Sequence, residues 1–212
     1  MSESSNGKLV VIAAPSGAGK TSLVKALVDN TTDIDVAVSH TTRNIRPGET
    51  DGVNYHFVAR AEFESMIEQD GFIEHAEVFG NLYGTSRASM DKIVQQGKNL
   101  VLEIDYQGAA QIRDKVADAI TIFILPPSLA TLKERLTNRG QDDGETIARR
   151  TSEAFNEISH YNEFDYLIVN DDFKVALDQI HAVINGGGSE FSCQRQRKAL
   201  ADLLSELLSS ET

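Results

Sequence analysis

The chain has 212 residues, of which 41% are apolar and 25% are charged, and its formal net charge is −12. This length is enough for one domain with insertions, while the negative charge argues against nucleic-acid or anionic-membrane binding, because both need a broad basic surface. The single cysteine, Cys193, excludes an internal disulfide framework, and the five histidines show no metal-ligand spacing.

An apolar run begins at Leu9, after a polar N-terminal stretch. The run, LVVIAA at residues 9–14, is typical of a strand buried on both faces of a sheet and is far too short to span a bilayer. No hydrophobic targeting segment precedes it, so we expect a cytoplasmic protein with no membrane partner.

The apolar run leads into a loop with the composition of a phosphate-binding loop. Gly17 and Gly19 allow consecutive backbone N–H groups to turn toward an oxyanion, while Lys20 can reach terminal phosphates. The Thr21 hydroxyl can bind magnesium at the start of the next helix. Ala14 stands where the usual pattern has its first glycine, and a methyl group is tolerable there if φ stays negative. The predicted ATP-binding residues of this loop are Ala14, Pro15, Ser16, Gly17, Ala18, Gly19, Lys20 and Thr21.

Residues 36–85 do not continue a βαβ pattern and predict a β-rich insertion. The expected elements are a strand at 36–43, a turn at 46–52, a strand at 55–58, a short helix that Gly71 ends, and a strand at 72–79 that reaches a hairpin-like break at 80–81. The insertion is rich in polar side chains, which suits a binding role.

The parallel pattern resumes at Ser86. The expected elements are a helix to about Gln96, a buried strand at 100–105, a helix through Ile112, a strand at 120–125, a helix capped by Ser128, a strand at 166–169 and a helix at 173–184. Together with the strand at 9–14 and a helix that begins at Ser22, they predict an α/β fold with a parallel sheet flanked by helices.

The strand at 100–105 ends in carboxylates. An acidic residue at the end of a strand beside a phosphate loop is where a magnesium shell is normally completed. Asp105 can also cap the helix that follows it, and the two roles are compatible. The sequence therefore leaves the magnesium ligand open between Glu103 and Asp105.

Four arginines, Arg135, Arg139, Arg149 and Arg150, flank a flexible break at residues 140–144. In a chain this acidic, such a cluster suggests a lid that folds over an anionic substrate, because guanidinium groups bind phosphate oxygens at two points. Alternatively, these arginines form surface ion pairs with the neighbouring acidic residues. The phosphate loop favours the lid.

The last segment differs in amino-acid composition from the rest of the chain. Residues 186–189, GGGS, read as a linker, and five leucines between Leu200 and Leu208 make an amphipathic helix. Its apolar stripe docks either on the core or on a second subunit, so a homo-oligomer is possible.

Several motifs together resemble guanylate kinases of the bacterial type, which are nucleoside monophosphate kinases with a phosphate-binding loop. They are APSGAGKT at residues 14–21, VSHTTR at 38–43, RPGE at 46–49, GNLYGT at 80–85, EIDYQG at 103–108 and RGQD at 139–142. The resemblance covers nearly the whole chain. It implies a core at 1–35 and 86–185 with a helical lid at about 136–150, a GMP-binding insertion at 36–85, and a linker and C-terminal helix at 186–212.

The resemblance also implies roles for individual residues. The residues implied in GMP binding are Ser39, Arg43, Arg46, Tyr55, Glu74, Tyr83, Thr85 and Asp105. Those implied in catalysis are Lys20, Arg43, Arg135, Arg139 and Arg150, and Asn170 is implied in ATP binding together with the phosphate loop. The implied magnesium ligands are Thr21, Glu103 and Asp105. Guanine presents N1–H and N2–H donors that one carboxylate can accept together, whereas adenine does not. Glu74 is therefore the expected discriminator.

The implied reaction transfers the γ-phosphoryl group of ATP to GMP, and to dGMP, giving ADP and GDP for guanine nucleotide synthesis and salvage, with Mg²⁺ as cofactor. No general base is required, because the phosphate of GMP, with a second pKa near ~6, is largely dianionic at neutral pH. Two alternatives are a non-catalytic binding module of the same fold, which predicts a degraded phosphate loop, and a kinase for a ribose bisphosphate, which predicts loss of the base-reading groups.

Overall fold

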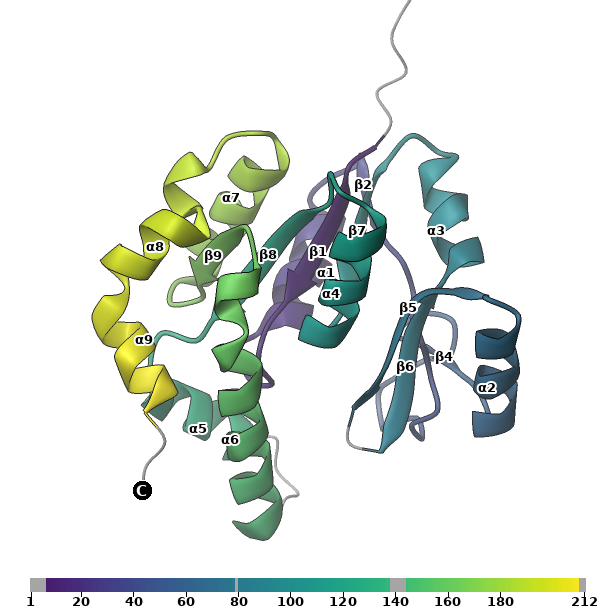
Figure 1. Cartoon of the computed structure of the whole chain (residues 1–212), viewed down its shortest axis with the longest axis horizontal. Helices are drawn as coiled ribbons and strands as arrows, with labels where there is room; N and C mark the ends of the chain where they lie inside the picture. The colour runs from purple at the N-terminus through teal and green to yellow at the C-terminus, as the bar shows by residue number, and fades with distance from the viewer. Residues whose placement is uncertain (1–6, 79, 138–143, 210–212) are drawn as a thin grey trace, which may run out of the picture.

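A five-stranded parallel sheet forms the centre of the computed structural model, which describes residues 7–78, 80–137 and 144–209, and of residues 144–150 only the helical backbone. Its strands, in spatial order, are β2 (Ile34–Val36), β7 (Asn99–Glu103), β1 (Leu9–Ala13), β8 (Ile120–Leu125) and β9 (Tyr166–Val169). Every neighbouring pair is parallel. The predicted parallel sheet with flanking helices is confirmed (Figure 1).

Alternate residues of each central strand face opposite layers of helices. Val10 and Ile12 pack with α1 (Lys20–Asp29) and α7 (Phe173–Ile184). Val11 and Ala13 pack with the other layer. That layer comprises α3 (Arg87–Val94), α4 (Tyr106–Lys115), α5 (Leu129–Thr137), α6 (Gly144–Ser159) and α9 (Ala201–Leu208). Burial on both faces explains why these strands are apolar throughout.

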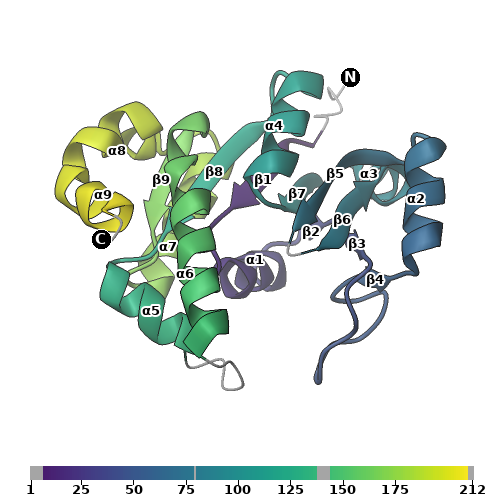
Figure 2. The same cartoon turned by 60° about the horizontal axis from the view of Figure 1, so that its bottom comes forward.

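A smaller four-stranded sheet lies beside the large one (Figures 1 and 2). Its spatial order is β4 (His56–Phe57), β3 (His40–Thr41), β6 (Asn81–Ser86) and β5 (Phe72–Val78). The helix α2 (Arg60–Glu68) covers it by stacking Phe63 on Phe72, with ring centroids 4.3 Å apart. The predicted β-rich character of this stretch agrees with the structure, although Phe79 lies outside the described residues.

The run expected as a single strand at 36–43 is instead divided between the two sheets. Ile34–Val36 pairs with β7 in the large sheet, while His40–Thr41 pairs with β4 and β6 in the small one. The chain crosses from one sheet to the other at residues 37–39, and this crossing carries the buried Ser39 to the boundary between them. The β propensity of the run gives no sign of the change in partner.

The tail packs on its own chain. The segment at 186–189, expected as a linker, is instead packed against the end of α7: Gly188 has φ +75°, and a Cβ there would lie 2.7 Å from Val183 Cγ2. The 3₁₀ turn η2 (Ser189–Phe191), α8 (Cys193–Ala199) and α9 follow. Leu204 and Leu207 are buried in the core next to α6, which favours the first of the two docking alternatives. Within the described part of the chain, no helix is long and apolar enough to cross a membrane.

Candidate nucleotide-binding cleft

A cleft of about 440 Å³ lies where the phosphate loop meets the small sheet. Its walls contain many of the residues that the sequence singled out. They are Ala14, Pro15, Ser16, Gly17, Gly19, Lys20 and Thr21 from the loop, Ser39, Arg43, Arg46, Tyr55, Glu74 and Tyr83 from the segment that forms the small sheet, and Glu103 and Asp105 from the end of β7. Four further predicted residues lie outside this lining. Thr85 contacts Ser39 and Glu74 of the lining, while Asn170 and Arg135 both donate to the backbone carbonyl of Ala18 in the loop.

The loop at residues 14–19 has the backbone that its glycines allow. Gly17 and Gly19 have φ angles of +90° and +92°, and α1 begins directly after Gly19, at Lys20 rather than Ser22. Positive φ values turn successive N–H groups to one side, as anion-binding loops require. The Lys20 ammonium donates to the carbonyl of Ile104 at 2.8 Å, which holds its side chain at the end of β7.

Asn170 supports the loop from the side. Its amide nitrogen donates to the carbonyl of Ala18 at 2.7 Å, and the same nitrogen would lie 2.5 Å from a Cβ at position 19. Gly19 therefore has both a backbone and a packing reason to be glycine. The guanidinium of Arg135 reaches the same carbonyl at 3.5 Å.

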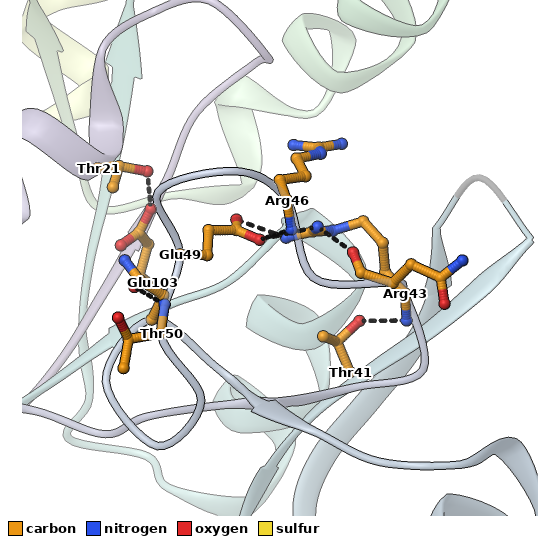
Figure 3. Close-up of polar contacts among 9 residues, drawn as sticks. Thr21, Thr41, Arg43, Arg46, Glu49, Thr50 and Glu103 are labelled. Carbon is orange, nitrogen blue, oxygen red and sulfur yellow. Dashed lines mark hydrogen bonds and ion pairs between the residues drawn. The ribbon is translucent and has the colours of Figure 1, made fainter.

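Thr21 and Glu103 meet at the floor of the cleft (Figure 3). The Thr21 hydroxyl donates to Glu103 Oε1 at 2.5 Å. Asp105, by contrast, caps α4: its Oδ1 accepts the N–H of Gly108 at 2.8 Å. The capping role that the sequence left open for Asp105 is thus confirmed, and it is Glu103 that lies beside the loop threonine.

Arg43 and Arg46 enter the cleft from the loop between β3 and β4. Glu49 binds the Arg43 guanidinium at two points, at 2.7 and 3.0 Å, and also accepts the backbone N–H of Arg46 at 2.8 Å. The hydrogen bond from Arg43 lowers the pKa of Glu49 from its usual range. Figure 3 shows the Arg46 side chain pointing away from that carboxylate, so the Arg46 guanidinium is not part of the ion pair between Arg43 and Glu49.

Two tyrosines stand beside these arginines. The Tyr55 and Tyr83 rings meet edge to face with centroids 5.9 Å apart, and the Arg43 guanidinium carbon lies 5.5 Å from the Tyr55 ring centre. Burial, together with the charge of Glu103, raises the pKa of Tyr55 to about 12. Tyr55 is therefore a neutral hydrogen-bond donor at any physiological pH.

Glu74 is the most deeply buried carboxylate of the cleft, with 3% of its surface exposed. Its Oε1 accepts the backbone N–H of Thr85 at 2.7 Å, and the hydroxyls of Thr85 and Ser39 lie 3.2 Å apart. Desolvation, and to a smaller degree the charge of Asp105, raises the pKa of Glu74 to about 7. A buried acceptor with two hydroxyls nearby is suited to bind a planar group that has several N–H donors.

Sequence reasoning missed two acidic residues of this site, Glu49 and Glu157. Glu157 lies on α6 and lines the cleft, where its Oε2 accepts the backbone N–H of Ser16 at 2.9 Å. Burial raises the pKa of Glu157 above its usual range. The RPGE motif contains Glu49 and was the signal that could have revealed it, whereas no local pattern distinguishes Glu157 from an ordinary polar residue on an amphipathic helix.

Three of the four predicted lid arginines cannot be placed. Arg139 lies outside the described residues, and Arg149 and Arg150 belong to the part of α6 whose side chains are not described. The described residues contain no group of three histidine, cysteine, aspartate or glutamate side chains that could hold a metal ion.

Comparison with known proteins gives one consistent answer. The family model "Guanylate kinase" matches residues 6–186. A guanylate kinase of Pseudomonas fluorescens (strain Pf0-1) is 55% identical over 96% of this chain and 98% of its own length, and one of Nitrosococcus oceani is 52% identical over 96% of this chain and 99% of its own. A crystal structure of guanylate kinase from Anaplasma phagocytophilum is similar with a TM-score of 0.72, at 34% identity, covering 97% of this chain and 98% of that one.

Proposed function

The chain belongs to the guanylate kinase family, and from this membership we infer that it transfers the γ-phosphoryl group of ATP to GMP, giving ADP and GDP. The enzyme is a nucleoside monophosphate kinase with ATP and GMP as substrates. One observation carries the assignment of its site: a phosphate-binding loop and a buried carboxylate, Glu74, line the same cleft.

The small sheet offers the contacts that guanine needs. Glu74, when ionised, can accept N1–H and N2–H together, and the Ser39 and Thr85 hydroxyls can contact O6 or N2. Adenine lacks the 2-amino group and has a bare acceptor at N1, so it would leave the buried carboxylate unpaired. The segment at 36–85 is therefore assigned to GMP, and dGMP, which presents the same base to Glu74, is proposed as a second acceptor.

The main chemical problem is charge, since two polyanions must meet in line. We assign the phosphate of GMP to Arg43, Arg46, Tyr55 and Tyr83, and the ATP phosphates to the loop amides and Lys20. The acceptor oxygen is already deprotonated at neutral pH, so the site needs no base and works by positioning and neutralisation.

A magnesium ion fits the residues where the start of α1 meets the end of β7. Thr21 of α1 and Glu103 of β7 are in direct contact there and supply two oxygen ligands beside the phosphate loop. Mg²⁺ commonly takes one or two protein oxygens and completes its shell with water and substrate phosphates, so a cluster of three acidic or histidine ligands is not needed. When bound, the ion would neutralise the phosphate oxygens during transfer. We propose Thr21 and Glu103 for this role.

The segment at about 136–150 is proposed as the lid. It covers the end of α5 and the first part of α6, and α6 extends below the large sheet in the view of Figure 1. Arg135 at the end of α5 already contacts that loop, and Arg139 and Arg150 follow it in sequence. Closure would bring guanidinium groups to the phosphates and keep water from the γ-phosphoryl group.

An assay of ADP release with ATP and magnesium tests the proposed reaction, comparing GMP with AMP, CMP, UMP and a ribose bisphosphate. Turnover with GMP alone is expected. The variant Lys20→Ala should lower this turnover by ~10³-fold or more, because the transferred phosphoryl group loses the lysine cation that neutralises it. Absence of turnover with every acceptor would favour a binding module, and preference for the sugar would overturn the role of Glu74.

A further inference from the structure

Gly108 lies in the first turn of α4, directly behind Glu74. A Cβ at position 108 would come within 2.5 Å of Glu74 Oε2 and within 3.2 Å of Glu74 Cδ and Ile104 Cδ1. The φ angle of Gly108 is not in the positive region, so the backbone does not require glycine there. Glycine costs a helix about 1 kcal/mol relative to alanine. The only evident gain at this position is space for the carboxylate.

The helix cannot easily move away to make room for a side chain. Gln111 of α4 exchanges two hydrogen bonds with the backbone of His75, the neighbour of Glu74 on β5, at 2.7 and 3.2 Å. Lys115 donates to the carbonyl of Ile73, and Asp105 holds the N–H of Gly108. Because α4 is fixed to β5 on both sides of Glu74, a Cβ at position 108 would displace the carboxylate instead.

The opposite side of the carboxylate is also fixed. Glu74 Oε1 is bound to the Thr85 backbone, and the side chain is almost fully buried. The carboxylate therefore has one position in which Oε1 accepts the N–H of Thr85 on β6 and Oε2 fits against Gly108 on α4. A displaced Oε2 is the end of a flexible side chain, so the fold tolerates the shift, but a two-point hydrogen bond to a planar base does not.

We propose that Gly108 is a specificity-determining residue, which sets the position of the Glu74 carboxylate against the base of the acceptor nucleotide. This inference rests on the proposed function. It predicts that the side chain at position 108 controls recognition of the 2-amino group, although residue 108 itself does not touch the base.

The test is the variant Gly108→Ala, measured against wild type with GMP and with IMP, whose base keeps N1–H but lacks the 2-amino group. The expected result is a rise in KM for GMP on the order of tenfold, a KM for ATP within twofold of wild type, and a fall in the GMP-to-IMP ratio of kcat/KM. A general loss of structure would lower activity with both acceptors and leave that ratio unchanged.

Two further variants make the result decisive. Ala110→Gly, on the same helix, alters helix propensity without adding an atom near Glu74, and it should leave the ratio unchanged. In a Glu74→Asp background the shorter side chain withdraws from position 108, so adding Gly108→Ala should cost much less there than in the wild type. Circular dichroism and melting curves verify folding, and if Gly108→Ala alone does not fold, the comparison of Glu74→Asp with the double variant still decides the matter.

The outcomes separate the two levels of inference. Failure of the wild type to use GMP would contradict the proposed function. A wild type that uses GMP, with Gly108→Ala keeping both its KM for GMP and its GMP-to-IMP ratio, would overturn the role of Gly108 alone. An equal cost of Gly108→Ala in both backgrounds would also overturn it, because the effect would not pass through the Glu74 carboxylate.

Discussion

Arg43, which lines the cleft, forms a two-point ion pair with Glu49, with Nη2–Oε1 and Nη1–Oε2 distances of 2.7 and 3.0 Å. Their side chains are only 11% and 19% exposed, so solvent screens the pair weakly. The same carboxylate accepts the Arg46 backbone N–H, which ties both proposed phosphate-binding arginines to one anchor. The pair holds the guanidinium plane in place before any substrate arrives.

We therefore expect Glu49→Ala to raise KM for GMP by ~10-fold, because Arg43 loses its fixed orientation and the loop between Arg43 and Glu49 loses a turn contact. The KM for ATP should stay within twofold in steady-state assays. Glu62→Ala, an exposed carboxylate on α2, is the matched control for the loss of one negative charge. A lower KM for GMP in Glu49→Ala would show instead that the carboxylate competes with the phosphate.

The buried Glu74 predicts a specific pH dependence. Burial raises the pKa of Glu74 to about 7, so the free enzyme carries a growing fraction of protonated Glu74 as the pH falls below 7. Only the ionised form can accept both donors of guanine, so kcat/KM for GMP should fall with decreasing pH, approaching tenfold per unit. In Glu74→Gln this limb should disappear, leaving the limb of the GMP phosphate near ~6. Identical pH profiles for the two proteins would contradict the assignment.

The contact between Glu157 and Ser16 predicts an effect on ATP. The carboxylate holds the backbone N–H of a loop residue at 2.9 Å from a helix that is far away in sequence. Glu157→Ala should raise KM for ATP several-fold, since the loop loses an anchor, whereas Glu157→Gln keeps an acceptor oxygen and should stay close to wild type. KM for GMP should not change in either variant. Equal KM values for ATP in the alanine and glutamine variants would show that the contact has no positioning role.

The sequence predicted the parts of the site whose chemistry is local. The loop from Ala14 to Thr21 carries its glycines, lysine and threonine at fixed spacing, and the structure forms it at the end of β1 with the expected positive φ values. The central strands could be predicted equally well, because burial on both faces makes them apolar throughout. Ser128 and Asp105 cap helices as their positions indicated.

What the sequence could not predict depends on contacts between distant segments. Ser16 and Glu157 are 141 positions apart, and no pattern in α6 indicates that its glutamate faces the loop. The role of Gly108 appears only once α4 lies against β5. Likewise, the crossing at residues 37–39 follows from the pairing of β2 with β7 in one sheet and of β3 with β4 and β6 in the other, and strand propensity contains no such information.

The docking of α9 gives a final prediction, on stability. Leu207 is fully buried in the core cluster that includes α6, whereas the adjacent Leu208 is 41% exposed. Leu207→Ala should lower the free energy of unfolding by about 3 kcal/mol in urea titrations, because it removes buried methyl groups and leaves a cavity. Leu208→Ala, with the same change of atoms, should cost less than about 0.5 kcal/mol. Because the contact lies within one chain, the loss in Leu207→Ala should not depend on protein concentration. Equal costs for the two leucines would show that the tail does not pack on the core, and a loss that grows on dilution would indicate that its partner is a second subunit.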